Sequence, residues 1–520
     1  MAKVSREVLF EDLDRRLAAS AAGGGPERVA KQNALGKLTA RQRVEALLDP
    51  GSFFELDALV THQCKDFGMD RKVVPGDGVI TGHGTIDGRR VHLFSQDCTV
   101  FGGSLSSAGA RKICKVIDLA ADTGTPLIGL NDGGGARIQE GVASLDGYAA
   151  LARRIAHASG WIPQISAILG ACAGGASYTP AGTDFLFMVE KTSFMFVTGP
   201  EVIRQATREE VTQEALGGAM THFSKTGVAH VKTPDDGTCL QEIRRLLSYL
   251  PDNSGQKPPR LAAPAENGHA GEELDEIIPE DPSSTYDVKA LINGIVDEDS
   301  FFELQAAWAK NIVIGLSRIG GFAVGIVANQ PKHLAGALDI NASLKAARFI
   351  RFCDAFEIPV FTILDTPGYL PGTHQEYNGI IRHGAKLGFA YAEATTPTIT
   401  LVTRKAYGGS YGAMGSKQIG CDVNLAYPSA EIAVMAPESS ARILYRNELT
   451  AAGENAAELY KQRVEELRSI LSNPYVAAAR GEIDAVIKPR ETRGHVLRSL
   501  EQLRTKNVVR RWKKHSNIPL

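Results

Sequence analysis

TGTPLIGLND at residues 123–132 and FEIPVFTILD at residues 356–365 are two versions of one segment, in which a proline precedes an apolar run and an aspartate closes it. The closing residues, Asp132 and Asp365, lie 233 positions apart, and the two prolines have the same separation. Self-similarity at a fixed spacing is typical of a duplicated structural unit. The segment therefore predicts a chain made of two copies of one fold.

Two further landmarks repeat in the same order. The motif SFFEL stands at 52–56 and again at 300–304, and a glycine pair at 174–175 recurs at 408–409. The stretch between the copies is rich in proline and acidic residues, which favours a solvated linker. We therefore expect three segments: an N-terminal domain over 1–255, a linker over 256–287 and a C-terminal domain over 288–520.

Strand-like and helix-like patterns alternate within each copy. Runs such as PLIGL, FLFMV and TITLVT are short, apolar and rich in β-branched or aromatic residues. Segments such as ARKICKVIDLAADTG place apolar residues at helical spacing between them. The alternation predicts an α/β layered fold in each copy.

Composition narrows the functional class. Hydrophobic residues make up 43% of the chain and charged residues 22%, with a formal net charge of −2. A near-neutral chain gives no electrostatic reason to expect nucleic acid or a membrane as partner. The 7 cysteines form no CxxC pair and no long apolar run occurs, so we expect no metal site and a cytoplasmic protein.

Small-residue loops follow the two repeated strands. NDGGGARIQEG occupies 131–141 and DTPGYLPG occupies 365–372. Glycine lets ligand atoms approach the backbone, so these loops supply candidate substrate-binding residues. Arg137 has two readings, contact with a phosphate or pairing with a neighbouring carboxylate. The candidates are Gly134, Gly135, Ala136, Arg137, Gly368 and Tyr369.

A glycine pair at a strand-to-helix turn is the second feature of each copy. A helix that starts there directs free N–H groups and its positive dipole end outward. Two N–H groups aimed at one oxygen form an oxyanion hole. The alternative is that the glycines only permit tight turns, and the occurrence of both features in both copies counts against it. Asp132 and Asp365 are better explained as carboxylates that cap local backbone N–H groups than as general bases.

Several segments resemble one family closely. NDGGGARIQEG, GACAGGASYTPAGTDF, PGYLPG, EYNGIIRHGAKLGFAYAEATTP and RKAYGGSYGAMGSK are similar to signature segments of acyl-CoA carboxylase β subunits, especially the propionyl-CoA carboxylase type. The resemblance runs from about residue 5 to 520. It implies tandem crotonase-like (ClpP/crotonase) domains of ββα superhelix type, assembled into a homo-hexamer, with sites between domains of different subunits.

The resemblance also implies roles for the glycine turns. Gly174 and Gly175 would donate N–H groups to the thioester carbonyl of an acyl-CoA. Gly409 and Ser410 would do so for the ureido oxygen of biotin, and relatives often have alanine at the latter position. The implied reaction moves CO2 from carboxybiotin to the α-carbon of the acyl-CoA without a side-chain base.

The resemblance implies a partner as well. The chain has neither an Ala-Met-Lys-Met biotinylation sequence nor an ATP-binding P-loop. Biotin carboxylase and the biotin carrier would therefore belong to a separate α subunit.

Gly412 bears on the substrate. Related propionyl-type enzymes usually have aspartate there and acetyl-preferring ones often isoleucine. Glycine removes volume and charge, so we expect propionyl-CoA or longer, medium-chain acyl-CoA, giving alkylmalonyl-CoA for lipid or polyketide assembly.

Two other functions remain open at this stage. Gly408–Gly412 matches the G-x-S-x-G elbow of serine hydrolases with Ser410 as nucleophile, but only His495 and His515 follow it in the chain. A biotin-dependent decarboxylase or transcarboxylase subunit would use the same turns for the same chemistry in another direction.

Overall fold

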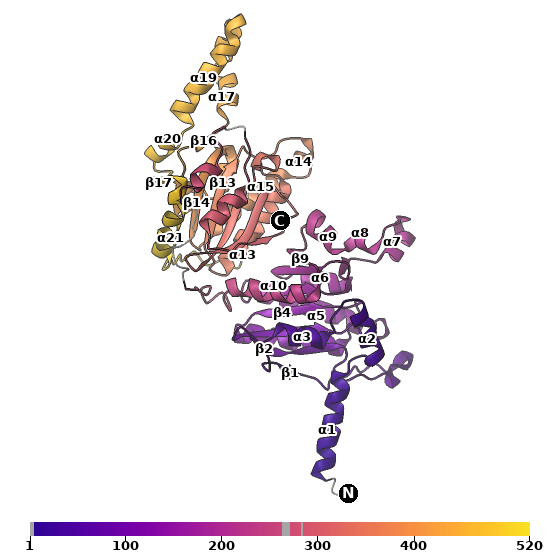
Figure 1. The fold of residues 1–520 in the computed structure, drawn as a ribbon. Coiled ribbons are helices and arrows are strands. Elements are labelled where there is room, and N and C mark those ends of the chain that lie inside the picture. Colours follow the sequence, from indigo (N-terminus) through magenta and orange to yellow (C-terminus); the bar gives the residue numbers. More distant parts are fainter. Residues whose placement is uncertain (1–4, 263–270, 282–283, 520) are drawn as a thin grey trace. The chain divides into compact units, whose positions relative to one another are not determined.

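The computed structural model describes residues 5–262, 271–281 and 284–519 of the chain. The chain divides into two compact units, Met1–Gln256 and Lys257–Leu520, drawn indigo to magenta and magenta to yellow in Figure 1. Each unit has a sheet and a hydrophobic core of its own. The predicted tandem α/β organisation is confirmed.

The first unit is built on a seven-stranded sheet in the order β1-β2-β3-β4-β5-β7-β9. β1 to β3 pair antiparallel, and the strands from β3 onward pair parallel. β7 is buried along its whole length, which explains its unbroken apolar sequence FLFMV. The strands are β1 (Phe54–Leu56), β2 (Val79–Ile86), β3 (Arg89–Gln96), β4 (Leu127–Asn131), β5 (Gln164–Ile168), β7 (Phe185–Val189) and β9 (Val231–Thr233).

The second unit repeats this topology. Its eight-stranded sheet has the order β10-β11-β12-β13-β14-β15-β17, with β16 paired to β14. β10 to β12 are again antiparallel and the later strands parallel. The strands are β10 (Phe302–Leu304), β11 (Ile312–Ile319), β12 (Phe322–Asn329), β13 (Val360–Thr366), β14 (Thr398–Tyr407), β15 (Val423–Ala426), β16 (Glu431–Ala433) and β17 (Ala485–Val486).

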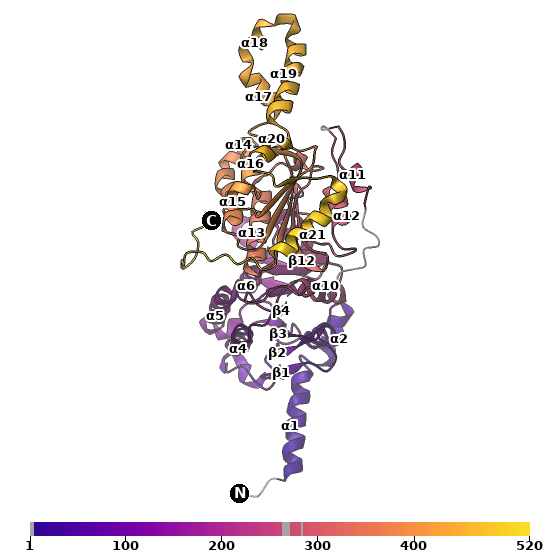
Figure 2. The ribbon, with the colours of Figure 1, turned by 90° about the vertical axis from the view of Figure 1, so that its left-hand side faces the viewer.

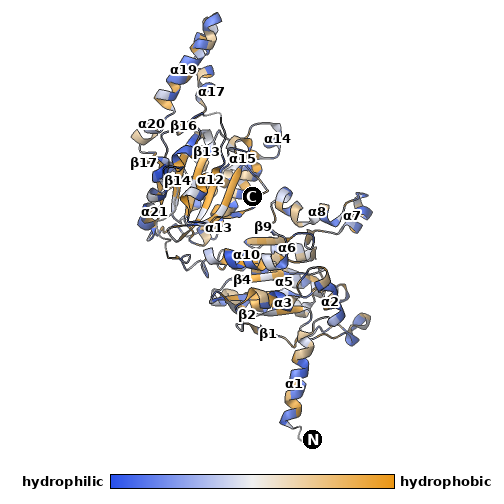
Figure 3. Cartoon of the chain, in the orientation of Figure 1, coloured by the Kyte–Doolittle hydropathy of each residue, from blue (hydrophilic) through white to orange (hydrophobic). Residues whose placement is uncertain are grey.

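Helices cover the sheets, and the apolar strands of each sheet lie between them (Figures 2 and 3). In the first unit α4 and α5 pack together, α4 on β2 and β3, while α3 and α10 pack on β3 and β7. In the second unit α13 and α15 pack together, and α12 and α21 contribute to the core cluster of that sheet. The bounds are α3 (Ala40–Leu47), α4 (Ser107–Thr123), α5 (Val142–Ala158), α10 (Asp236–Tyr249), α12 (Val288–Ile295), α13 (Ile340–Ala355), α15 (Ile380–Glu393) and α21 (Thr492–Leu503).

Part of the segment expected as a linker packs into the second unit. Leu274 and Tyr286 are 1% and 5% exposed in its core, and the Leu261 N–H donates to the Gly321 carbonyl at 3.1 Å. Leu274 begins the short helix α11 (Leu274–Ile277), whose apolar face explains the burial. Residues 263–270 and 282–283 of the segment lie outside the described residues.

A helical arm extends from the second sheet (Figures 1 and 2). It comprises α17 (Pro437–Leu444), α18 (Arg446–Ala451) and α19 (Ala456–Leu471), and α17 and α19 pack against each other. Their contact forms the small apolar cluster of Ala441, Val464 and Leu467. In the described part of the chain, no helix combines the length and apolar character needed to cross a membrane.

Candidate active site

The loop at 131–141, here called the first loop, is held by a clamp of two backbone hydrogen bonds. The Leu105 N–H donates to the Gly135 carbonyl at 2.8 Å, and the Arg137 N–H donates to the Leu105 carbonyl at 2.9 Å. Leu105 is buried and precedes Ser106, the N-cap of α4, so the clamp fixes the loop close to the start of that helix. Ala136, between the two bonds, keeps its N–H without an acceptor among the described residues.

The loop at 365–372, the second loop, has the same clamp. The Leu338 N–H donates to the Gly368 carbonyl at 3.0 Å, and the Leu370 N–H donates to the Leu338 carbonyl at 2.8 Å. Tyr369 takes the place of Ala136, and its hydroxyl donates to the Gly384 carbonyl at 3.2 Å. The duplication has therefore preserved backbone geometry while replacing a methyl group with a phenol.

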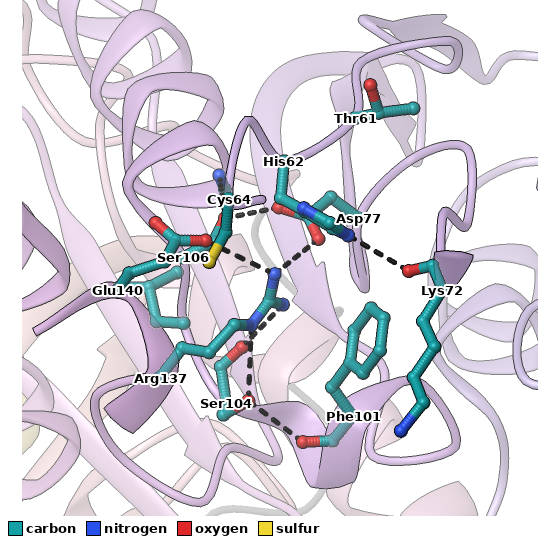
Figure 4. Close-up of polar contacts among 12 residues, drawn as sticks. Thr61, His62, Cys64, Lys72, Asp77, Phe101, Ser104, Ser106, Arg137 and Glu140 are labelled. Atoms are coloured by element: carbon teal, nitrogen blue, oxygen red, sulfur yellow. Dashed lines mark hydrogen bonds and ion pairs between the residues drawn. The ribbon is translucent and has the colours of Figure 1, made fainter. Parts of the chain in front are cut away.

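Arg137 is a structural anchor of the first loop (Figure 4). Its guanidinium is 1% exposed, and Nη1 lies 2.7 Å from Oδ1 of Asp77. Nη2 donates to the Ser104 carbonyl at 2.9 Å, and the group lies 4.6 Å from the centre of the Phe101 ring. Of the two readings of Arg137, the structure shows the pairing with a carboxylate. With 1% of its side chain exposed, Arg137 is enclosed by these partners within the fold.

The first turn, Gly174–Ala176, joins β6 (Ala171–Ala173) to α6 (Gly175–Ala181). Gly174 has φ 56° and ψ −124°, a conformation that glycine adopts readily. Its N–H donates to the carbonyls of Phe196 and Val197 at 3.2 and 3.1 Å, across the pairing of β6 with β8 (Phe194–Phe196). This N–H is therefore already paired within the fold, and the donors open to a ligand begin at the next residue.

The next two residues carry the available donors of the first turn. The N–H groups of Gly175 and Ala176, at the start of α6, have no acceptor among the described residues. Gly175 packs against Tyr148, since a methyl group on Gly175 would lie 2.6 Å from that ring. A methyl group on Gly135 would lie 3.2 Å from the Ala173 carbonyl oxygen, so the first loop and first turn are adjacent.

The second turn, Gly408–Ser410, repeats this arrangement between β14 and α16 (Gly408–Ala413). Gly408 has φ 63°, and the N–H groups of Gly409 and Ser410 lack acceptors among the described residues. A methyl group on Gly409 would be 4.0 Å from the Tyr369 ring, which places the second loop beside this turn. Each unit thus brings together one loop and one turn with a pair of free N–H groups.

The side chain of Ser410 is not set up as a nucleophile. It is 0% exposed, and its hydroxyl donates to the Tyr407 carbonyl at 2.7 Å. Among the described residues it makes no hydrogen bond to a histidine, which the elbow of a serine hydrolase requires. The serine hydrolase alternative finds no support in this geometry.

The two strand-terminal aspartates are held by cations that the sequence patterns did not reveal. Asp132 lies 2.8 Å from Nζ of Lys37 and 2.9 Å from Nη1 of Arg43. Asp365 lies 3.1 Å from Nε of Arg404 and accepts from the Lys405 N–H at 3.1 Å, while burial raises its pKa. Both carboxylates are thus tied to the scaffold. Contrary to the expectation, neither carboxylate caps a backbone N–H group near it in sequence among the described residues: Lys405 lies 40 positions beyond Asp365, and the partners of Asp132 come from a distant helix and loop.

Gly412 faces open space. A methyl group placed on it would meet no atom within 4 Å. A groove of about 660 Å³ lies along the same helix, between Gly409 and Tyr411 on one side and the arm on the other. Apolar side chains dominate its walls, among them Ile432, Val434, Ile443, Leu444, Leu467 and Leu471. No group of three or more His, Cys, Asp or Glu residues within the described ranges is placed to hold a metal ion.

Known proteins resemble the whole chain. The family model for the carboxyl transferase domain matches residues 31–518. The propionyl-CoA carboxylase carboxyltransferase subunit of Haloferax mediterranei is 53% identical, over 99% of this chain and 100% of its own length. The methylmalonyl-CoA decarboxylase α subunit of Propionigenium modestum is 50% identical, over 98% of this chain and 99% of its own. The transcarboxylase 12S, solved as a hexamer with methylmalonyl-CoA and methylmalonic acid bound, has a TM-score of 0.97 at 46% identity, covering 100% of this chain and 99% of its own.

Proposed function

The chain belongs to the carboxyl transferase domain family, and we propose that it is the carboxyltransferase (β) subunit of a biotin-dependent acyl-CoA carboxylase. The tandem crotonase-like α/β fold expected for that family is confirmed. The enzyme transfers a carboxyl group to an acyl-CoA. Carboxybiotin is the donor, and an alkylmalonyl-CoA is the product.

One observation carries the mechanism: each unit ends a strand in a glycine turn with two free N–H groups. Carboxyl transfer develops negative charge on two oxygens, the thioester oxygen of the acyl-CoA enolate and the ureido oxygen of biotin. Two pairs of fixed backbone donors match two developing oxyanions. The chain itself would then need no side-chain base, because bound biotin would supply the base for the α-proton at its ureido group.

We propose one pair of donors for each substrate. Gly175 and Ala176 bind the thioester oxygen, with Ala176 taking the role first given to Gly174. Gly409 and Ser410 bind the ureido oxygen. Gly134, Gly135 and Ala136 line the acyl-CoA side, and Gly368 and Tyr369 line the biotin side.

The proposed partners are a second subunit and further copies of this chain. Biotin is carried by a separate α subunit that also contains the biotin carboxylase, a proposal that the naming of a relative as a carboxyltransferase subunit supports. A homo-hexamer is supported by the likeness to the transcarboxylase 12S, which is described as one. A cytoplasmic location agrees with seven cysteines that are all free thiols.

The substrate is propionyl-CoA or a longer, medium-chain acyl-CoA. A relative is named as a propionyl-CoA carboxylase subunit, which supports propionyl-CoA as a substrate. The open space at Gly412 supports tolerance of a longer acyl chain. The test is a carboxylation assay with a biotinylated α subunit, ATP and bicarbonate across acetyl-, propionyl-, butyryl-, hexanoyl- and octanoyl-CoA. We expect activity on propionyl-CoA that persists with longer chains and falls about tenfold on octanoyl-CoA in Gly412→Asp. Equal octanoyl-CoA activity in that variant would reject the role of Gly412.

The likeness to the methylmalonyl-CoA decarboxylase subunit favours one second candidate, the reverse reaction. The same two turns serve either direction. Release of CO2 from methylmalonyl-CoA, with no carboxylation by a competent α subunit, would select the decarboxylase.

A further inference from the structure

The two turns differ in what flanks them, although their backbones match. Next to the first turn, β6 pairs with β8 through Ala171 opposite Phe194 and Ala173 opposite Phe196, all without charge. Next to the second turn, the paired strands β14 and β16 carry Tyr407 and Glu431 instead. The Ser177 hydroxyl ties the first turn to the Cys172 and Phe196 carbonyls, whereas among the described residues only the second turn has a connection that includes a charged side chain of the neighbouring strand.

This connection runs from the turn to the arm. The Tyr407 hydroxyl donates to Oε2 of Glu431. Oε1 of Glu431 lies 3.2 Å from Nε of Arg468 on α19, and Nη2 of Arg468 lies 3.0 Å from Glu438 on α17. Burial, with the nearby Glu431, raises the pKa of Tyr407, so the phenol remains a donor. Arg468 and Tyr407 therefore contact different oxygens of the same Glu431 carboxylate.

Tyr407 lies directly before the second turn, whose Gly409 and Ser410 N–H groups are its free donors within the described residues. It is 5% exposed and directly precedes Gly408, whose positive φ turns the chain into α16. Its carbonyl accepts the Ser410 hydroxyl at 2.7 Å, so Tyr407 contacts the turn through its backbone as well. A methyl group on Gly408 would lie 3.2 Å from the Val434 carbonyl oxygen, which shows how closely the end of β16 supports the turn.

We infer that Arg468 is a positioning residue for the second turn: through Glu431 and Tyr407 it fixes the direction of the Gly409 and Ser410 N–H groups. The inference rests on the proposed function, in which those groups bind the ureido oxygen of biotin. Arg468 acts on the biotin half of the reaction and leaves the acyl-CoA half unchanged, because within the described residues its connection leads to the second turn and not to the first. In a preorganised site, small displacements of the donors strongly lower the rate of the reaction.

The arm contains a matched control. Arg463 also lies on α19, with 30% side-chain exposure against 31% for Arg468. It pairs with Glu448 at 2.8 Å and Glu466 at 2.6 Å and lies over the Tyr445 ring, all within the arm. Removing it perturbs the arm to a similar extent without touching β16 or the turn.

The test compares Arg468→Gln, Arg468→Lys, Tyr407→Phe and Arg463→Gln in the full chain. The assay is carboxyl transfer from methylmalonyl-CoA to free biotin, in which the bond from the α-carbon to the carboxyl breaks and a bond from the ureido nitrogen to the carboxyl forms. The biotin proton passes to the α-carbon. Arg468→Gln and Tyr407→Phe are expected to lower kcat/KM for biotin about tenfold and leave KM for methylmalonyl-CoA within about twofold.

Arg468→Lys is expected to recover part of the loss, and Arg463→Gln to match the wild type. Equal losses in Arg468→Gln and Arg463→Gln, or a loss spread over both substrates, would overturn the inference. Hydrogen exchange of the peptide over 405–414 gives a readout independent of activity. Arg468→Gln should speed that exchange and Arg463→Gln should not, and unchanged exchange in both would also overturn it. An inactive wild type with the expected exchange difference would instead count against the proposed function.

Discussion

The first and second turns share a backbone but differ in almost every side chain around it. Each has a positive-φ glycine followed by two residues with free N–H groups, and each lies beside a clamped loop. The Tyr148 ring packs against the first turn. Around the second lie Tyr369 and a helical arm.

This comparison indicates that the backbone of the turns, and not their side chains, performs the chemistry. After duplication, side chains diverged while the direction of the backbone donors was kept. A group that binds an oxyanion through N–H needs no particular side chain, so Ala176 and Ser410 are equivalent at their positions. Side chains around the turns are free to specialise for different substrates.

The largest expected effect is on the free energy of unfolding, and it comes from removing the arginines that pair with the two strand-terminal aspartates. The guanidinium of Arg43 is fully buried and pairs with two carboxylates, those of Asp132 and Asp236. Among the described residues, the guanidinium of Arg404 pairs with one carboxylate, that of Asp365. Arg43→Met leaves two buried carboxylates short of a partner, which should lower the free energy of unfolding by about 3–5 kcal/mol. Arg404→Met should cost less. Urea unfolding followed by circular dichroism measures both, and a greater loss in Arg404→Met would contradict the ranking.

Removal of one donor tests the second turn directly. Proline at Gly409 deletes an N–H group at the start of a helix, a position where proline is tolerated. We expect a 10²–10³-fold fall in kcat for carboxylation, on the order of 3–4 kcal/mol in barrier. Gly409→Ala keeps the N–H and is the control, expected within about threefold of the wild type. A fully active Gly409→Pro variant would show that this donor is not used.

One substitution should act differently in the two turns. Gly175→Ala places a methyl group 2.6 Å from Tyr148, while Gly409→Ala meets only a ring atom of Tyr369 at 4.0 Å. The first variant should lose about 1–3 kcal/mol of stability through overpacking, and the second less than about 0.5 kcal/mol. Thermal unfolding of the two variants side by side measures this. Similar midpoints would mean that the turns are packed alike.

The duplicated lysines, Lys112 and Lys345, should have a smaller effect on the free energy of unfolding, and this effect depends on pH. Burial lowers the pKa of Lys345 to about 7 and that of Lys112 to about 8. An unfolded lysine has a pKa of about 10.4, so above pH 7 the unfolded chain binds more protons. The free energy of unfolding therefore rises with pH between about 7 and 10, by about 1 kcal/mol per unit from Lys345. Lys345→Met should flatten this rise in unfolding scans at pH 7.0 and 9.5, and an unchanged slope would contradict it.

The sequence allowed the duplicated fold and both turns to be predicted, because glycine spacing and strand periodicity are local signals. It did not show that the Gly174 N–H donates to the Phe196 carbonyl, because that partner lies 22 positions away and no local pattern reveals it. The sequence also left two readings of Arg137 open, because its carboxylate partner, Asp77, lies 60 positions upstream. The connection from Arg468 to the second turn depends on the placement of an arm that only the folded chain defines.

The central claim is that backbone N–H groups, rather than side chains, perform the chemistry of both turns. Exchanging the two side chains tests it most directly: the double variant Ala176→Ser with Ser410→Ala keeps every N–H group and removes the serine hydroxyl. Measured by carboxylation of propionyl-CoA with the biotinylated α subunit, this variant should retain activity within a few-fold of the wild type. A loss of more than about 100-fold in a normally folded protein would show that the Ser410 hydroxyl takes part and would contradict the account.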